Sequence, residues 1–251
     1  MEQSAIAAAA AALISARSTG RLLDGLDAAH KPATVHDALA IQDATVRALG
    51  DDVAGWKVGS VLDGKLVRGV LLRSRVFASP ATIPARLVPL LGVEAEIAFR
   101  FDRALPPRDR DYTYDEVAAA VTAMVAIEVV DTRYRDYRAA PMIERVADCV
   151  SNGAFVEGTI RPGWRDVDLS RLNVELIVDG VAIVAQASSH PAGDPLLPAV
   201  ALVNDLRAGE GVAAGQVMTT GTCSGLNFVK PGQSVIAKFA DFGTAEVTFP
   251  A

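Results

Sequence analysis

The clearest pattern of apolar and polar positions in this chain lies between Val93 and Phe101. Every second residue from Val93 to Phe101 is apolar, and Glu94, Glu96 and Arg100 occupy intervening positions. Successive side chains of a β-strand point to opposite faces, so this alternation predicts a strand with one apolar face. The opposite face carries both carboxylates.

Residues before position 50 follow a helical period instead. Apolar residues recur every three or four positions in 3–17 and about 35–49, and Gly20 and Gly50 follow these segments. We therefore predict two helices, because this spacing places apolar side chains on one helical face and glycine commonly follows a helix end.

Beyond Gly55, short β-branched runs cut by glycine and proline predict strands and turns. Thr113 and Glu116 have the spacing of a capping box, which begins a helix. We expect this helix to continue through 117–125 and to be followed by a strand at 127–131.

The second half alternates again on either side of one turn. Asp179-Gly180 separates the alternating segments 173–178 and 181–187, which predicts a β-hairpin. A helix is expected over about 197–207, and Gly-rich β segments continue to Phe249.

Strands dominate this pattern and helices are inserted among them. The expected fold class is therefore α+β, with a mixed, mostly antiparallel sheet and peripheral helices. No repeat or linker divides the sequence, so we expect one domain over 1–251. Within it, 1–50 forms a helical portion and 51–251 a β-rich catalytic portion.

Composition narrows the class of protein. The chain has 251 residues, of which 51% are hydrophobic and 22% charged, as is typical of folded globular proteins. A net charge of −6 without a dense Lys/Arg run argues against nucleic-acid binding. The N-terminus has no basic region, and the alanine run 5–12 is short, so neither an export signal nor a membrane span is expected.

Only two cysteines occur, Cys149 and Cys223. They are too few for a disulfide framework or a cysteine-rich zinc site, and a cytoplasmic location is expected. Cys223 has no evident histidine partner, so a nucleophilic role is disfavoured.

Glu94 and Glu96 would lie on the same face of their strand, roughly 7 Å apart along the backbone. A Glu-x-Glu pair of this kind is most often the solvated face of an edge strand. Here the flanking residues are apolar or small, and only Arg100 is at hand to compensate the charges.

A third carboxylate, Glu128, stands inside the apolar segment Met124–Val130. Burying an unpaired carboxylate is costly unless it is protonated or gains a partner. Three carboxylates suit a hard cation with oxygen ligands, so Glu94, Glu96 and Glu128 are candidate ligands of Mg²⁺ or Mn²⁺.

Lys57 lies between two glycines in Gly55-Trp56-Lys57-Val58-Gly59. A surface lysine on a turn is one interpretation. The other is a cation that holds a substrate carboxylate or enolate, or a proton carrier.

Several other polar residues have two interpretations. His190 could be a general base, although a lone loop histidine is more often structural. Asp131 and Arg133 could flank the metal or form an ordinary ion pair, and Asp148 could orient a base. The Gly-rich segments match no nucleotide-binding motif.

Three segments together resemble the fumarylacetoacetate hydrolase superfamily: Gly55–Gly59, Gly92–Phe99 and Ala126–Arg133. The resemblance continues through Val146–Ser151, His190–Leu196, Thr219–Thr222 and Pro231-Gly232, and covers roughly residues 50–250. It is strongest to the branch of 2-oxopent-4-enoate hydratases and 4-oxalocrotonate decarboxylases.

This resemblance implies a mixed β roll with peripheral helices and a divalent metal on Glu94, Glu96 and Glu128. It implies a small 2-oxo or enol acid substrate and chemistry through a metal-bound enolate, to which a hydratase adds water. Lys57 and Ser151 are the implied catalytic and substrate-binding residues, with Thr222 as a further substrate contact.

Departures from the branch keep other activities open. Where the branch carries an acidic residue after its Gly-Val-Leu turn, this sequence has Leu72-Arg73-Ser74-Arg75. A decarboxylase is therefore one alternative. An acylpyruvate carbon–carbon hydrolase is another, and it would need His190 or Glu144 to activate water.

A non-catalytic metal-binding subunit is the alternative from another class, although the retention of Lys57 and Ser151 argues against it. The resemblance further implies a homo-oligomer and a complex with another enzyme of the pathway.

Overall fold

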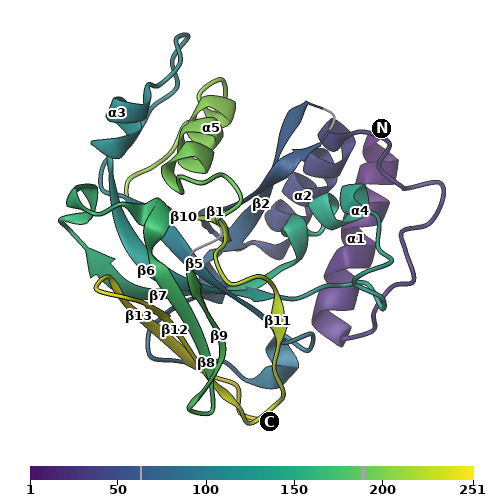
Figure 1. Ribbon diagram of the computed structural model, residues 1–251. Coiled ribbons are helices and arrows are strands. Elements are labelled where there is room, and N and C mark those ends of the chain that lie inside the picture. Colours follow the sequence, from purple (N-terminus) through teal and green to yellow (C-terminus); the bar gives the residue numbers. More distant parts are fainter. Residues whose placement is uncertain (63, 188–189) are drawn as a thin grey trace.

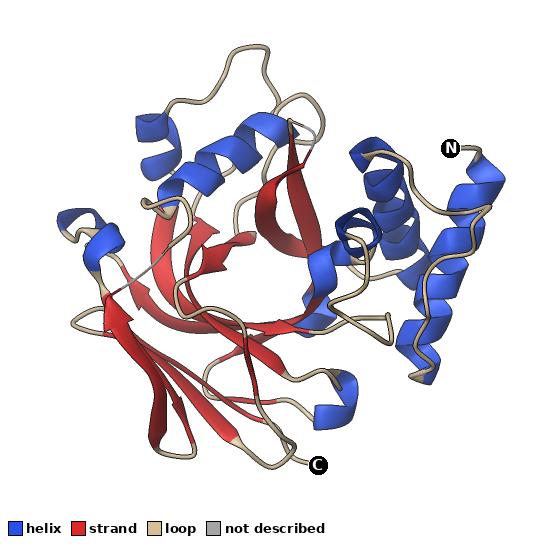
Figure 2. Ribbon diagram, turned by 45° about the vertical axis from the view of Figure 1, so that its right-hand side comes forward, coloured by secondary structure: helices blue, strands red, loops and turns tan. Residues whose placement is uncertain are grey.

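The computed structural model describes residues 1–62, 64–187 and 190–251. Two β-sheets form the centre, and helices lie at their periphery (Figures 1 and 2). The larger sheet has the strand order β2-β1-β10-β5-β6-β7-β3, and β11 pairs with one end of β5. Its strands are β1 (Val53–Leu62), β2 (Lys65–Leu72), β3 (Val76–Ala78), β5 (Gly92–Phe101), β6 (Val121–Val130), β7 (Asn152–Arg161), β10 (Val217–Thr222) and β11 (Asn227–Phe228).

The smaller sheet packs on the larger one. Its strand order is β4-β13-β12-β8-β9, and β12 and β13 contact β6 and β7 of the larger sheet. Apolar side chains from both sheets form one core between them. The strands are β4 (Ala81–Thr82), β8 (Asn173–Val178), β9 (Val181–Ala187), β12 (Ser234–Phe239) and β13 (Gly243–Thr248).

Helices α1 (Gln3–Thr19), α2 (Val35–Leu49) and α4 (Met142–Ala147) share a second apolar cluster, to which Val67 of β2 also belongs. They group on one side of Figure 1, whereas α3 (Tyr114–Ala118) and α5 (Leu196–Leu206) lie at another. Short 3-10 turns occur at 73–75, 85–87, 149–151, 164–166 and 169–171.

Most strand pairs are antiparallel; the parallel pairs among the described residues are β1–β10, β3–β7 and β4–β13. The expected α+β class with a mixed, mostly antiparallel sheet is confirmed. Both N-terminal helices, the 93–101 strand, the Asp179-Gly180 hairpin and the helix near 197–207 also agree with the structure to within two residues.

The helix predicted over 117–125 is wrong. The Thr113 capping box forms as expected, but α3 ends at Ala118, and β6 begins at Val121. The expected strand at 127–131 is only the end of β6. Because β6 pairs with β5 and β7 and is buried on both faces, it lacks the alternation that would identify a half-buried strand.

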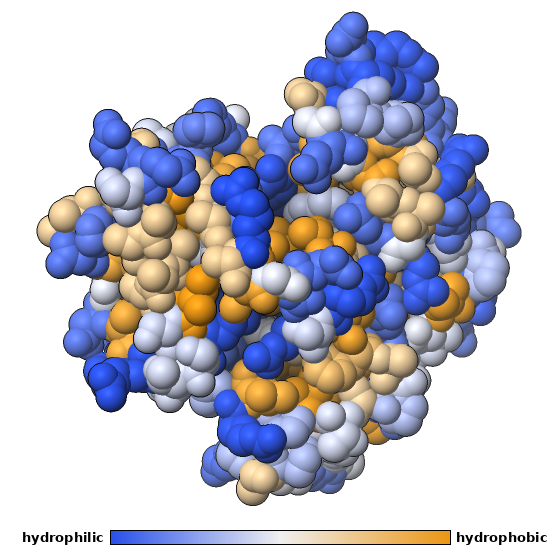
Figure 3. All heavy atoms as spheres, turned by 180° about the vertical axis from the view of Figure 1, so that it is seen from behind, coloured by the Kyte–Doolittle hydropathy of each residue, from blue (hydrophilic) through white to orange (hydrophobic). Residues whose placement is uncertain are grey.

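On the face shown in Figure 3, polar side chains cover much of the surface, and apolar side chains reach it in separate patches. No helix within the described part of the chain is long and apolar enough to span a membrane.

Candidate metal centre

The three glutamates of the sequence prediction converge on one face of the larger sheet. Glu94 and Glu96 lie on β5, which is a central strand and not a solvated edge. Glu128 lies on β6 directly opposite Glu94 in the antiparallel register. Each carboxylate offers an oxygen, and these three oxygens lie within 4.8 Å of one another.

Lys57 of β1 faces the same cluster. Its ammonium lies 2.8 Å from Glu128 Oε1 and 3.9 Å from Glu94 Oε2. In the strand order β10 and β5 separate β1 from β6, so the sheet must curl to bring these groups together. Lys57 is therefore a strand residue with a mostly buried side chain, and not a surface lysine on a turn.

Arg100 does not compensate these charges. It pairs with Glu157, at 2.9 Å, and leaves Lys57 as the cation of the cluster. Three carboxylates and one ammonium leave an excess of negative charge in a largely buried space. A bound cation would neutralise this charge.

Burial and mutual repulsion raise the pKa values of Glu94 and Glu96 in the cluster. Burial raises the pKa of Glu94 to about 7, against the opposing effect of Lys57. Burial, with the charges of Glu128 and Glu94, raises the pKa of Glu96 well above its ordinary value. Burial acts to lower the pKa of Lys57, but the charges of Glu128 and Glu94 outweigh it and raise that pKa.

A strand end holds Glu96 in place. The backbone N–H groups of Thr220 and Gly221 both donate to Glu96 Oε2 at 3.0 Å, and the Thr219 hydroxyl donates to the same oxygen. These three residues stand in the segment that carried the family resemblance, but sequence analysis gave them no role. A register shift between β10 and β5 exposes these donors, and no local sequence pattern reports it.

The hydrogen bonds of the Glu128 carboxylate indicate whether the cluster fits a metal ion. Asn152 Nδ2 donates to Glu128 Oε1 at 3.1 Å, yet Glu128 Oε2 is buried and has no hydrogen-bond partner among the residues that the structure describes. An orphaned carboxylate oxygen costs free energy unless it is protonated or coordinates a cation. The donor set of Glu94, Glu96 and Glu128 therefore fits a hard divalent cation.

The cluster opens into a cavity of about 800 Å³, a size that suits a small organic acid. Lys57, Glu94 and Glu96 reach this cavity, as do Ser151 and Thr222. Apart from the β-strands, its walls come from α4, α5, Tyr137, the turn at 149–151 and the segment at Pro191 and Ala192. The structure thus brings together all the residues predicted to bind substrate, and Glu128 lies buried beside them.

Ser151 reaches the cavity through an unusual backbone. Cys149, Val150 and Ser151 all have positive φ, between 52° and 58°, which non-glycine residues rarely adopt in succession. The Ser151 hydroxyl is buried, and within the described part of the chain it has no hydrogen-bond partner. Strain of this kind is held by the surrounding packing and concentrates at functional sites.

Ser74 and its neighbours lie outside this cavity. The Ser74 hydroxyl donates to Asp51 Oδ2 at 2.5 Å on the exposed surface. The segment that lacks the acidic residue of the branch therefore places no side chain on the cavity wall.

His190 and Glu144 were the two residues suggested for water activation. Neither side chain is free to act as a base, because both are held by hydrogen bonds or an ion pair. His190 Nε2 lies 3.1 Å from both Thr220 oxygens, and its Nδ1 accepts from the Ala192 N–H. Glu144 accepts from the Leu26 N–H at 2.8 Å and lies 3.3 Å from Lys31. Both arrangements favour structural roles.

Arg133 forms ion pairs with Asp148, at 2.5 Å, and with Asp131, at 3.4 Å. Of the two interpretations, the structure thus favours an ordinary ion-pair network, to which Asp148 also belongs. Cys223 is fully buried in the main core, which disfavours a nucleophilic role.

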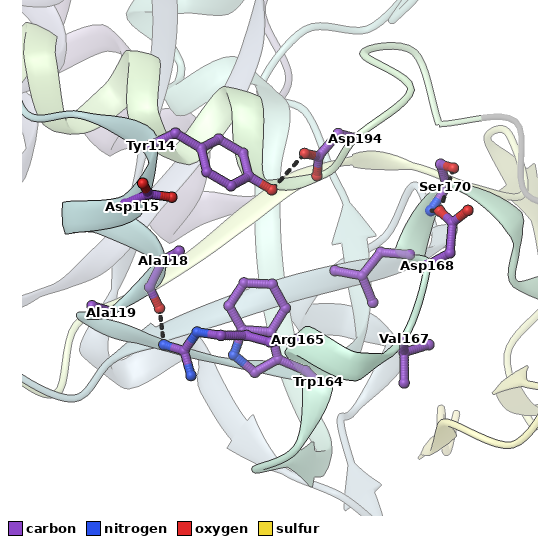
Figure 4. Close-up of a pocket in the computed structure, with 11 residues that line it drawn as sticks. Tyr114, Asp115, Ala118, Ala119, Trp164, Arg165, Val167, Asp168, Ser170 and Asp194 are labelled. Carbon is purple, nitrogen blue, oxygen red and sulfur yellow. Dashed lines mark hydrogen bonds between the residues drawn. The ribbon is translucent and has the colours of Figure 1, made fainter.

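A second cavity, of about 450 Å³, lies between α3 and the turns at 164–166 and 169–171 (Figure 4). Its polar groups are partly engaged with one another: the Tyr114 hydroxyl donates to Asp194 at 2.8 Å, and Arg165 donates to the Ala118 carbonyl. It shares no lining residue with the carboxylate cavity, and we assign the chemistry to the latter.

This fold and carboxylate cluster define the class of protein. Residues 71–249 match the model of the fumarylacetoacetate hydrolase C-terminal family, and the chain belongs to that family. The family predicted from the sequence is thereby confirmed.

Relatives by sequence extend over the whole chain. A 2-keto-4-pentenoate hydratase of Burkholderia vietnamiensis is 29% identical and covers 99% of this chain and 98% of its own. Another of Paraburkholderia xenovorans is 29% identical and covers 96% and 93%. A 4-oxalocrotonate decarboxylase of Pseudomonas putida is 29% identical over 54% of this chain and 51% of its own.

A solved structure shares the fold. The 4-oxalocrotonate decarboxylase of Pseudomonas putida G7, complexed with magnesium and adipate, has a TM-score of 0.85 at 22% identity, and the match covers 99% of this chain and 98% of that one. The predicted fold is confirmed by this likeness.

Proposed function

We propose that this chain is a divalent-metal-dependent hydro-lyase that adds water to a 2-hydroxydienoate or 2-oxo-4-enoic acid. The observation that carries the proposal is the convergence of Glu94, Glu96 and Glu128 beside Lys57 at a cavity sized for such an acid. Relatives named 2-keto-4-pentenoate hydratase, similar along nearly the whole chain, support the same reaction.

Glu94, Glu96 and Glu128 would hold Mg²⁺ or Mn²⁺, because these ions prefer oxygen ligands and keep waters or substrate oxygens in the remaining positions. When bound, the ion would act as a Lewis acid that stabilises negative charge on the 2-oxygen of the substrate.

The reaction itself balances without a redox cofactor. The dienol loses its 2-hydroxyl proton and gains one at C5, which leaves a 2-oxo-3-enoic acid. Water then adds across the new double bond, with its hydroxyl at C4 and a proton at C3. The chain must therefore hold the acid, move protons and admit a single water.

Lys57 and Ser151 are suited to the first two tasks. The Lys57 ammonium stays charged in the cluster and can donate a hydrogen bond to the substrate carboxylate or 2-oxygen. The Ser151 hydroxyl, which has no hydrogen-bond partner among the described residues, lines the same cavity and can hydrogen-bond the substrate. Thr222 lines the same cavity and would complete the contacts.

An ultraviolet assay tests the proposal. The protein is treated with chelator and mixed with freshly generated 2-hydroxypenta-2,4-dienoate, with and without Mg²⁺ or Mn²⁺, and the product is identified by mass. Metal-restored loss of the dienol with gain of one water is the expected result. No turnover in the presence of either metal would refute it.

A decarboxylase on the same scaffold is the second candidate. The relatives named 4-oxalocrotonate decarboxylase favour it. In the assay above it would leave the dienol unhydrated, and it would release carbon dioxide from 4-oxalocrotonate in a metal-dependent manner.

We further infer a homo-oligomer. Strand β9 is an edge of the smaller sheet, and Val181 and Ile183 on it are 65% and 48% exposed. An exposed apolar edge strand is a template for pairing with another chain. Light scattering coupled to size exclusion should give a mass above that of one chain, and Ile183→Lys should lower it.

A further inference from the structure

Another cavity, of about 400 Å³, lies where the end of α1 meets the segment that follows β6. It shares no lining residue with the carboxylate cavity, so an inference drawn from it does not depend on the proposed function. Its lining is unusual for a chain of net charge −6, because four arginines reach it and only one carboxylate does. The residues of this arginine pocket that carry charge are Arg17, Arg75, Arg86, Arg133 and Asp131.

The carboxylates at the pocket are already engaged by Arg133. Asp131 and Asp148 both pair with it, at 3.4 Å and 2.5 Å. Asp148 Oδ2 also accepts from the Arg133 N–H, and Asp131 Oδ1 accepts from the Leu90 N–H. The Arg133 guanidinium further donates to the carbonyl oxygens of Asp148 and Asn152. This arginine is therefore satisfied within the fold, and it leaves little carboxylate for the other three.

Arg17 has a mostly buried guanidinium without such partners. Its side chain is 12% exposed, and Asp148 Oδ1, with which it pairs, lies 3.9 Å away, beyond hydrogen-bonding distance. Its guanidinium donates no hydrogen bond to any of the described residues. Burial and the charge of Arg133 lower the pKa of Arg17 to about 10. A mostly buried cation without hydrogen bonds is costly, so its retention in the fold calls for an explanation.

Arg75 and Arg86 add to the positive charge of the pocket. Arg75 donates to the Leu87 carbonyl at 3.2 Å, and no carboxylate of the described ranges lies within ion-pair distance of Arg75 or Arg86. Burial and the charge of Arg133 lower the pKa of Arg75, so these cations repel one another. Set against the two aspartates that pair with Arg133, the four arginines leave an excess of two positive charges.

We propose that the arginine pocket binds a phosphate group, either as the free ion or at the end of a small metabolite. Guanidinium groups bind phosphate oxygens through paired, charge-assisted hydrogen bonds. A phosphate group carries about two negative charges and three strong acceptor oxygens, which match the excess charge and the several arginines better than a singly charged carboxylate does. Arg17 is the principal donor in this proposal, because its guanidinium is mostly buried and has no hydrogen bond of its own.

Calorimetric titration of the full, metal-free chain tests the proposal. Any chelator is dialysed away first, because it is itself a polyanion. The titrations are run at about pH 8, where a phosphate group is a dianion. Inorganic phosphate and glycerol 2-phosphate are the two probes, and acetate is the singly charged comparison. We expect saturable binding of one phosphate group per chain, with acetate about tenfold or more weaker. The tighter of the two phosphate probes shows whether the pocket takes the free ion or an ester.

Arg17→Met should weaken phosphate binding by about tenfold or more, because it removes a charge-assisted donor while methionine keeps much of the apolar packing. Arg75→Met should weaken it as well, and this second variant leaves α1 untouched if Arg17→Met does not fold. Arg47→Met is the control. Arg47 lies in the last turn of α2 as Arg17 lies in the last turn of α1, but it does not line the pocket, so the affinity should not change.

Absence of saturable phosphate binding to the wild-type chain would overturn the proposal, as would wild-type affinity in both Arg17→Met and Arg75→Met. A fall in oligomeric mass in Arg17→Met, when the wild type binds no phosphate, would show that a carboxylate of another copy fills the pocket instead. Because the titration uses neither metal nor dienol, its failure would leave the proposed hydro-lyase activity untouched.

Discussion

The ammonium of Lys57 lies 2.8 Å from Glu128 Oε1, although two strands separate their strands in the sheet order. This pair joins β1 and β6, which are not neighbours in the curled sheet, and Lys57 supplies the positive charge of the carboxylate cluster. Breaking a buried pair leaves an uncompensated charge, which is more costly than the pair itself is favourable.

Lys57→Met should therefore destabilise the metal-free protein. In chelator, we expect the free energy of unfolding in urea to fall by roughly 3–5 kcal/mol, because three carboxylates then lose their cation. Added Mg²⁺ should recover part of the loss. Lys238→Met, which removes an exposed pair with Glu175, should cost only about 0–1 kcal/mol. Similar losses in the two variants would contradict this role of Lys57.

Glu96→Gln should lower metal affinity and remove activity while leaving the fold intact. The amide oxygen can still accept hydrogen bonds from Thr220 and Gly221, but a neutral ligand binds a hard cation more weakly. Calorimetric titration with Mn²⁺, together with the dienol assay, measures both effects. Glu246→Gln, at an exposed position on β13, is the control. An active, metal-replete Glu96→Gln protein would refute the assignment of the site.

Local patterns predicted the parts of this site that lie on one strand. Glu94 and Glu96 were recognised because their i, i+2 spacing on an alternating strand fixes a shared face. Glu128 was recognised by its apolar surroundings, but its place opposite Glu94 depends on the β5–β6 register. Its distance from Lys57 depends on the curl of the whole sheet.

No local sequence pattern identified β6 as a strand or Ser151 as a site residue. The prediction of a helix over 117–125 was wrong because alanine and methionine favour helices in isolation. In the structure, pairing with β5 and β7 on its two sides stabilises β6 as a strand. The family resemblance supplied Ser151, which spacing alone could not have identified.

Gly69→Ala should disturb the turn that positions Ser151. A Cβ at Gly69 would lie 2.2 Å from the backbone oxygen of Cys149, so the strained turn at Cys149–Ser151 must shift. We expect a loss of stability of roughly 1–3 kcal/mol and a severalfold fall in kcat/KM. Gly163→Ala, whose added Cβ meets nothing, is the control. Unchanged activity in Gly69→Ala would show that the position of Ser151 does not matter for turnover.

His190 should make stability depend on pH. Burial lowers the pKa of its imidazole, and the hydrogen bond to Thr220 and the charge of Asp194 oppose that shift only in part. Below about pH 6.5, the ordinary pKa of histidine, the unfolded chain binds a proton that the folded imidazole resists. Its contribution to stability is therefore complete above that pH and is lost as the pH falls.

His190 by itself should thus make the free energy of unfolding, measured in urea at about pH 5 and about pH 7.5, rise with pH, whereas the raised pKa values of Glu94 and Glu96 give the opposite slope. Compared with the wild type, His190→Gln should therefore make the change between the two pH values more negative. The substitution also removes hydrogen bonds to Thr220 and Ala192, so stability at the higher pH should fall as well. His36→Gln, at an exposed position of α2, should keep the wild-type dependence. If His190→Gln and His36→Gln have the same slope, the folded imidazole accepts a proton as readily as the unfolded one, and burial does not govern its charge.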